Sequence, residues 1–158
     1  MFYLSDEKKA KDETEENMED RVIYTADIEE ISEPKLRKVL LFGEVEEEKA
    51  AEIVNAMFYL KESGSTITFS DPQDIESELV REHEPFEFVI STYGGAAAEM
   101  FGIYDTMRMI REECVIKTLA LGKAMSAGVL LLASGTKGER RIGENCRVML
   151  HSVLGGNH

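Results

Sequence analysis

A serine that could act as a nucleophile, Ser126, lies where a predicted apolar strand gives way to a helix. Small residues flank it, which would let a substrate backbone approach its hydroxyl: Gly122, Ala124, Ala127 and Gly128. The N-terminus of the helix would direct unpaired N–H groups and a partial positive charge at a developing oxyanion. Serine is also an ordinary helix N-cap, so the motif alone leaves both interpretations open.

Two other features of the sequence could take part in catalysis or binding. Gly94 and Gly95 follow a buried strand, and paired glycines expose backbone N–H groups without side chains in the way. Such a turn could cradle phosphate, donate to an oxyanion or only reverse the chain; it lacks the lysine and third glycine of nucleotide-binding loops. His151 ends an apolar strand, where a histidine can be a core residue or a general base.

Composition narrows the class of partner. The chain has 158 residues, a net charge of −13 and 43% apolar residues, which suits one globular domain. Its acidity argues against nucleic acid and against an anionic membrane surface, because both need clustered Lys and Arg. No stretch is long and apolar enough to be a signal segment or to span a bilayer. Cys114 and Cys146 show no metal or redox spacing. We therefore expect a reducing, cytoplasmic location.

Charge also divides the chain. Residues 1–33 hold 12 acidic and 4 basic residues, so we expect an acidic, mobile N-terminal segment followed by a core over residues 34–158. Residues 62–85 are polar and acidic, and Pro72 after a possible cap predicts a short surface helix up to about residue 82. His83 in this insertion is expected to be solvated.

The elements that must position the chemical residues alternate between strands and helices. Strands are predicted at 37–42, 86–92, 114–121 and 147–151, with turns at 93–95 and 122–126. Helical spacing of apolar residues follows the first two strands, and a helix of small residues is expected at 127–134. Consecutive strand–turn–helix units favour a parallel sheet with crossover helices, so the predicted class is α/β.

These motifs, in this order, resemble the ClpP family of serine peptidases. The resemblance covers roughly residues 36–61 and 86–156. Its most specific parts are the sequence Ile-Tyr-Asp-Thr-Met at 103–107 and the segment Arg-Val-Met-Leu-His at 147–151, followed by Leu-Gly-Gly at 154–156. The resemblance implies a single-domain ClpP/crotonase-like core of parallel-stranded β-β-α units.

The resemblance also implies roles for individual residues. Ser126 would be the nucleophile and His151 the general base, while backbone N–H groups of Gly95 and Ala127 would form the oxyanion hole. The implied activity is serine-type endopeptidase cleavage of unfolded polypeptides, with no cofactor and no metal. Family members form rings that enclose a chamber and receive substrates from an ATP-dependent AAA+ unfoldase. We expect self-association through the apolar faces of the helices that carry Met57 and Met107.

This sequence departs from the family pattern at three places. Tyr93 stands where family members usually have proline, and the insertion at 62–85 has no family counterpart. The family's triad aspartate lies beyond the histidine, so the C-terminal part that carries it is missing here. The chain alone is therefore expected to be weakly active or inactive, since an unoriented imidazole can adopt the wrong tautomer.

Two alternatives belong to other functional classes. One is a non-catalytic or inactive ClpP-like ring subunit or fragment, which the missing aspartate favours and the retained Ser126 and His151 oppose. The more distant one is a crotonase-type acyl-CoA enzyme, whose chemistry uses carboxylates and a basic site for coenzyme A phosphates. No such basic site is visible in the sequence.

Overall fold

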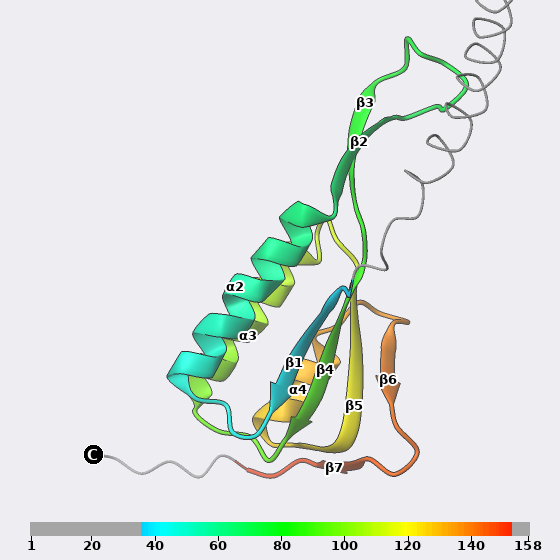
Figure 1. Cartoon of the computed structure of the whole chain (residues 1–158). Helices are drawn as coiled ribbons and strands as arrows, with labels where there is room; N and C mark the ends of the chain where they lie inside the picture. Colours follow the sequence, from blue (N-terminus) through cyan, green and yellow to red (C-terminus); the bar gives the residue numbers. More distant parts are fainter. Residues whose placement is uncertain (1–35, 153–158) are drawn as a thin grey trace, which may run out of the picture. The chain divides into compact units, whose positions relative to one another are not determined.

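The computed structural model describes residues 36–152, so the acidic segment predicted at 1–33 lies outside it. Residues 37–152 form one α/β domain (Figure 1). The elements, in chain order, are β1 (Lys38–Phe42), α2 (Glu47–Ser63), β2 (Ser65–Phe69), β3 (Leu79–His83), β4 (Phe86–Thr92), α3 (Ala97–Ile110), β5 (Ile116–Met125), α4 (Ala127–Ala133), β6 (Arg140–Ile142) and β7 (Arg147–Met149).

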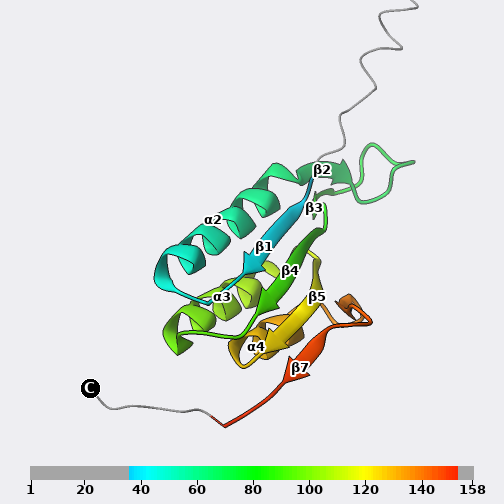
Figure 2. The same ribbon diagram turned by 60° about the horizontal axis from the view of Figure 1, so that its bottom comes forward.

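The main sheet is parallel throughout. Its strands lie in the order β1-β4-β5-β6, and β7 pairs with the far end of β5 (Figures 1 and 2). Parallel neighbours need crossover connections, which α2, α3 and α4 provide. The predicted parallel α/β core is therefore confirmed.

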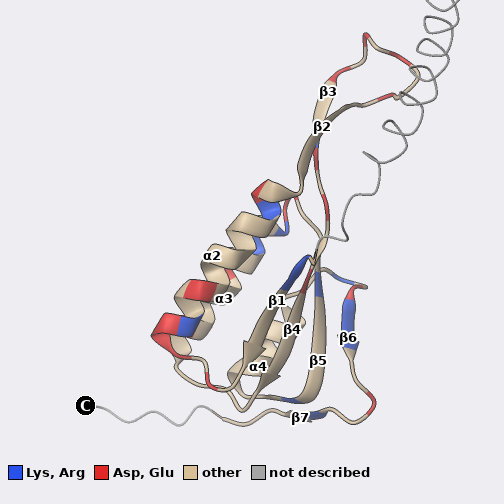
Figure 3. Cartoon of the chain, in the orientation of Figure 1, with Lys and Arg blue, Asp and Glu red and all other residues tan. Residues whose placement is uncertain are grey.

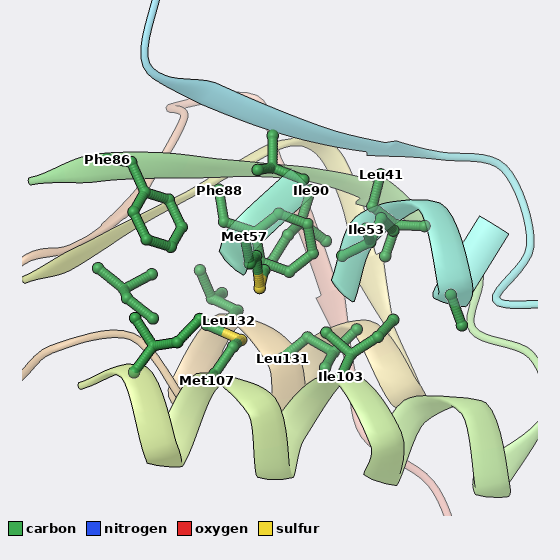
Figure 4. Packing of buried hydrophobic residues seen from close by; sticks show 14 of the residues in the cluster. Leu41, Ile53, Met57, Phe86, Phe88, Ile90, Ile103, Met107, Leu131 and Leu132 are labelled. Atoms are coloured by element: carbon green, nitrogen blue, oxygen red, sulfur yellow. The ribbon is translucent and has the colours of Figure 1, made fainter. Parts of the chain in front are cut away.

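One face of this sheet carries the hydrophobic core. Phe86, Phe88 and Ile90 of β4 point from that face towards side chains of α2, α3 and α4 (Figure 4). Met57 and Met107 are fully buried in the same cluster. The expectation that these methionine faces would pack between neighbouring subunits is therefore wrong, because the chain uses them for its own core.

The opposite face of the sheet, here called the outer face, holds a buried carboxylate. Glu87 of β4 lies between Lys38 of β1, with Nζ 3.0 Å from its Oε2, and Arg141 of β6, which pairs with its Oε1. Burial of Glu87 works to raise its pKa, but the two cations outweigh it and hold the pKa below the ordinary value of 4.5. The carboxylate thus ties three strands together in its charged form.

Residues 65–83 form a β-hairpin of β2 and β3 where the sequence predicted a short helix. Pro72 begins the connecting turn instead, in which Asp71 accepts a hydrogen bond from the N–H of Gln73. His83 is also not solvated as predicted: its side chain is buried, with Nδ1 3.0 Å from the carbonyl oxygen of Lys61. β-branched and aromatic residues fill positions 66–69 of β2 and favour a strand, but the polar composition of the whole insertion concealed this signal.

The fifth strand is longer than predicted. Residues 122–125, expected as a turn, continue β5, which pairs there with β7. The register between β4 and β5 shifts between Ile90 and Thr92. Gly122 lies in the irregular part of β5 opposite this shift and has a positive φ. None of the described helices has the length and apolarity needed to cross a bilayer.

Candidate active site

Ser126 occupies a strained position between β5 and α4. Its φ of 53° and ψ of −120° make it the one residue other than glycine with a positive φ among the described residues. Such backbone costs about 1–3 kcal/mol and persists only where surrounding contacts hold it. The side chain makes no capping hydrogen bond to α4, so the N-cap interpretation does not fit. A serine on a sharp strand-to-helix turn presents its hydroxyl outward instead.

Strand β7 brings His151 to this serine. The N–H of Ser126 donates to the carbonyl oxygen of Met149 at 2.9 Å, and His151 follows two residues later. Ser126, Ala127 and His151 consequently line one cavity of about 460 Å³ together with Gly95 from the other side. Met100 and Leu150 supply apolar side chains to its wall. The structure thus brings all four sequence-predicted site residues to the same cavity.

The Gly94–Gly95 turn packs directly on the serine. A Cβ atom on Gly94, whose φ is 113°, would lie 2.7 Å from Cβ of Ser126 and 3.2 Å from its Oγ. A Cβ atom on Gly95 would lie 2.2 Å from the carbonyl oxygen of Val45. Only glycine therefore fits at either position.

Thr92 fixes the conformation of this turn and was not identified from the sequence. Its buried hydroxyl accepts a hydrogen bond from the N–H of Gly94 at 2.9 Å and donates to the carbonyl oxygen of the same residue at 3.2 Å. Its methyl group faces α4, where a Cβ atom on Gly128 would approach it to 2.5 Å. The available signal was a threonine at the end of an apolar strand just before paired glycines.

Two backbone N–H groups border the cavity. The N–H of Ala127 belongs to the first turn of α4, where N–H groups have no acceptor within the helix. The carbonyl oxygen of Gly94 accepts from Val45, and the N–H of Ala96 donates to Val45, but the N–H of Gly95 has no acceptor within the described part of the chain. Both groups are thus available to an oxygen bound in the cavity.

Tyr93 lies beside this turn with most of its ring exposed. The ammonium of Lys123 sits 4.6 Å from the ring centroid, a cation–π contact between the ends of β4 and β5. His151 is exposed, and within residues 36–152 no carboxylate contacts its imidazole. The same residues hold no group of three or more His, Cys, Asp or Glu side chains arranged to bind a metal ion.

Comparison with known proteins agrees with this fold. The family model described as Clp protease matches residues 76–158, just over half of the chain. Among solved structures, the chain is similar to the ClpP protease catalytic domain from Plasmodium falciparum, with 26% sequence identity and a TM-score of 0.59. The match covers 74% of this chain and 55% of that one, so the chain spans little more than half the length of this relative.

Proposed function

This chain belongs to the Clp protease family, and from that premise we propose that it is a serine endopeptidase that cleaves unfolded polypeptides inside an oligomeric chamber. Ser126 is the nucleophile and His151 the general base in this proposal. The observation that carries it is the strained backbone of Ser126, which faces a cavity shared with His151 and with two N–H donors.

The proposed reaction uses these groups in turn. Oγ of Ser126 attacks the carbonyl carbon of the peptide bond while an imidazole nitrogen of His151 takes its proton. The N–H groups of Gly95 and Ala127 stabilise the resulting oxyanion. His151 then returns the proton to the leaving amine, which departs and leaves an acyl-enzyme. Water, deprotonated by His151, attacks the carbonyl carbon of the ester. As the acid product leaves, His151 returns that proton to Oγ of Ser126.

An extended polypeptide is the substrate class that suits this site. Small and apolar side chains line most of the cavity around Ser126 and His151, which suits the backbone of an extended chain better than a bulky or charged group. We infer that an ATP-dependent AAA+ unfoldase supplies such chains, as the resemblance to the ClpP family implies, and that the domain acts in the cytoplasm.

Active-site labelling tests the catalytic assignment. A fluorophosphonate probe should label wild-type protein, and Ser126→Ala should abolish labelling without loss of fold. His151→Ala should slow labelling strongly, because the serine loses its base. Ser152→Ala, which removes a hydroxyl near His151 but not the proposed nucleophile, serves as the matched control. Labelling that survives Ser126→Ala would overturn the proposed mechanism.

A second candidate, a non-catalytic ring subunit, is favoured by one observation. No carboxylate contacts the imidazole of His151 within the described residues, and an orienting acid is what sets its tautomer. The labelling experiment separates the two candidates, because a purely structural subunit would react with the probe no faster than its Ser126→Ala variant does.

A further inference from the structure

The outer face of the sheet is exposed along β1, whereas Val89 at its centre is buried. Side chains paired in register point to the same side, so Leu40 and Phe42 of β1 share this face with Val89 of β4 and Leu119 of β5. Leu40 is 58% exposed and Phe42 54% exposed. Parallel sheets in proteins almost always have both faces covered, so this apolar surface is expected to have an occupant.

The rim of the outer face is basic. Lys38 and Lys117 pair in register with Glu87 from either side, and Arg141 joins them from β6. Glu87 compensates only one of these three positive charges. The outer face therefore combines an apolar centre with a basic end.

The hairpin of residues 65–83, here called the arm, has complementary properties. Ile67 and Phe69 are two residues apart in β2, and Leu79 pairs with Phe69, so all three lie on one face. Their exposed fractions are 61%, 40% and 61%. The arm contains 5 acidic residues and a single basic one, Arg81. An isolated two-stranded hairpin is marginally stable in water, so the arm too is expected to bind a surface.

The root of the arm is held firmly. The guanidinium of Arg37 donates hydrogen bonds to the carbonyl oxygens of Leu60, Glu84 and Pro85, and it fills the space that a side chain at Gly64 would need. On the other side, Lys61 forms a 2.6 Å ion pair with Glu113. The arm thus projects from an anchored base (Figure 1), and its apolar face is exposed to solvent.

We propose that the arm of one copy of this chain binds the outer face of a second copy. The apolar face of the arm covers Leu40 and Phe42, and its acidic tip lies against the basic end of the outer face. Figure 3 shows these two charged regions on different parts of the domain, with acidic residues at the arm and basic residues on β6. Because each copy has one arm and one outer face, the contact is heterologous, so it can join more than two copies.

A second copy is favoured because the arm has an exposed apolar face of its own that also needs a partner surface. The acidic segment of the same chain is the competing occupant: residues 5–20 hold almost no apolar side chains, but residues 1–4 and 22–31 contain several. The arm contact rests on the proposed function in one respect, because it names the surfaces through which the proposed self-association occurs. It does not depend on the roles of Ser126 and His151.

Sedimentation velocity over a concentration series tests the contact. Ile67→Ser with Phe69→Ser removes the apolar face of the arm, and Leu40→Ser with Phe42→Ser removes that of the outer face. Each pair should lower the association constant at least about tenfold, since central apolar contacts dominate interfaces. The matched control is Tyr59→Ser with Met109→Thr, which removes two side chains of α2 and α3 that are more exposed than those tested and should not change the association constant. Circular dichroism establishes that each variant is folded.

Mixing the two defective proteins makes the test specific. In this mixture the arm variant keeps an intact outer face and the outer-face variant keeps an intact arm. A complex of two chains should therefore form and grow no further. Self-association unchanged in both variants, or no pairing in the mixture, would overturn the arm contact alone. A monomeric wild type would overturn it as well, and would also contradict the oligomer in the proposed function. If residues 1–35 cover the outer face, Leu40→Ser with Phe42→Ser lowers stability without changing mass, which likewise overturns the contact.

Discussion

At the scale of single residues, the site depends on two backbone positions that touch. Gly94 adopts a φ that side chains rarely permit, and Ser126 adopts a positive φ despite its side chain. The missing Cβ of Gly94 is what makes room for Cβ and Oγ of Ser126. The hydroxyl therefore keeps its place only while the neighbouring turn stays free of side chains.

Replacing Gly94 should damage both activity and stability. Gly94→Ala places a methyl group within 2.7 Å of Cβ of Ser126 and adds strain at a φ of 113°. We expect a loss of about 1–3 kcal/mol in the free energy of unfolding and slower fluorophosphonate labelling. Thermal denaturation and labelling kinetics measure the two effects. Gly102→Ala is the control: its new methyl group meets open space in α3, so it should be neutral or stabilising. An equally tolerated Gly94→Ala would contradict the packing described.

At the scale of elements, the ion pairs of Glu87 join β1, β4 and β6. Glu87→Gln should lower the free energy of unfolding by about 1–3 kcal/mol at neutral pH, because it removes charge-assisted hydrogen bonds from a buried site. Urea denaturation measures this loss. Glu52→Gln, on the exposed side of α2, is the control and should have little effect.

The difference between wild type and Glu87→Gln should depend on pH in a defined direction. The pKa of Glu87 in the folded state lies below its ordinary value of 4.5, so the folded state favours the charged form. Its stabilisation is complete above that value and is lost as the pH falls through the folded pKa. A difference in stability that persists unchanged under strongly acidic conditions would contradict this role.

The sequence predicted most elements because their burial patterns are simple. The strand at 86–92 and the helix carrying Ile103 follow regular apolar patterns, and both are confirmed. The arm was missed because neither of its faces is buried in the domain, so its alternation of apolar residues is weak and its acidic composition suggested a surface helix. The extension of β5 depends on pairing with β7, a long-range contact that local pattern cannot show.

The candidate site was predictable as a set of residues but not as a geometry. The resemblance to the ClpP family points to Ser126, His151, Gly95 and Ala127, and all four line one cavity. The strain at Ser126 and the hydrogen bonds of Thr92 arise from contacts between distant segments, which no local motif encodes. The catalytic roles of the four residues remain predictions, and the labelling experiment tests those of Ser126 and His151.

At the scale of the whole molecule, turnover should be limited by the lack of a carboxylate that orients the imidazole of His151. The 158-residue chain alone is expected to hydrolyse short fluorogenic peptides very slowly, with a kcat lower by about 10⁴ if the loss matches that of a serine protease without its acid. The loss should fall on kcat more than on KM, since the N–H donors and the cavity remain. The reference is the Plasmodium falciparum catalytic domain assayed in parallel. Comparable turnover would mean that another group orients His151.

The strained backbone of Ser126 affects which residue would be selected at this position. A glycine there would relieve the strain at a φ of 53°. Ser126→Gly should therefore raise the free energy of unfolding by about 1 kcal/mol, and the melting temperature with it, while Ser126→Ala keeps the strain and should not. Differential scanning calorimetry of the two variants measures this, and an equal melting temperature would contradict it. Random mutagenesis screened for heat resistance alone would therefore enrich glycine at this codon and discard the proposed nucleophile. Persistence of serine in a population would then report that its hydroxyl is in use.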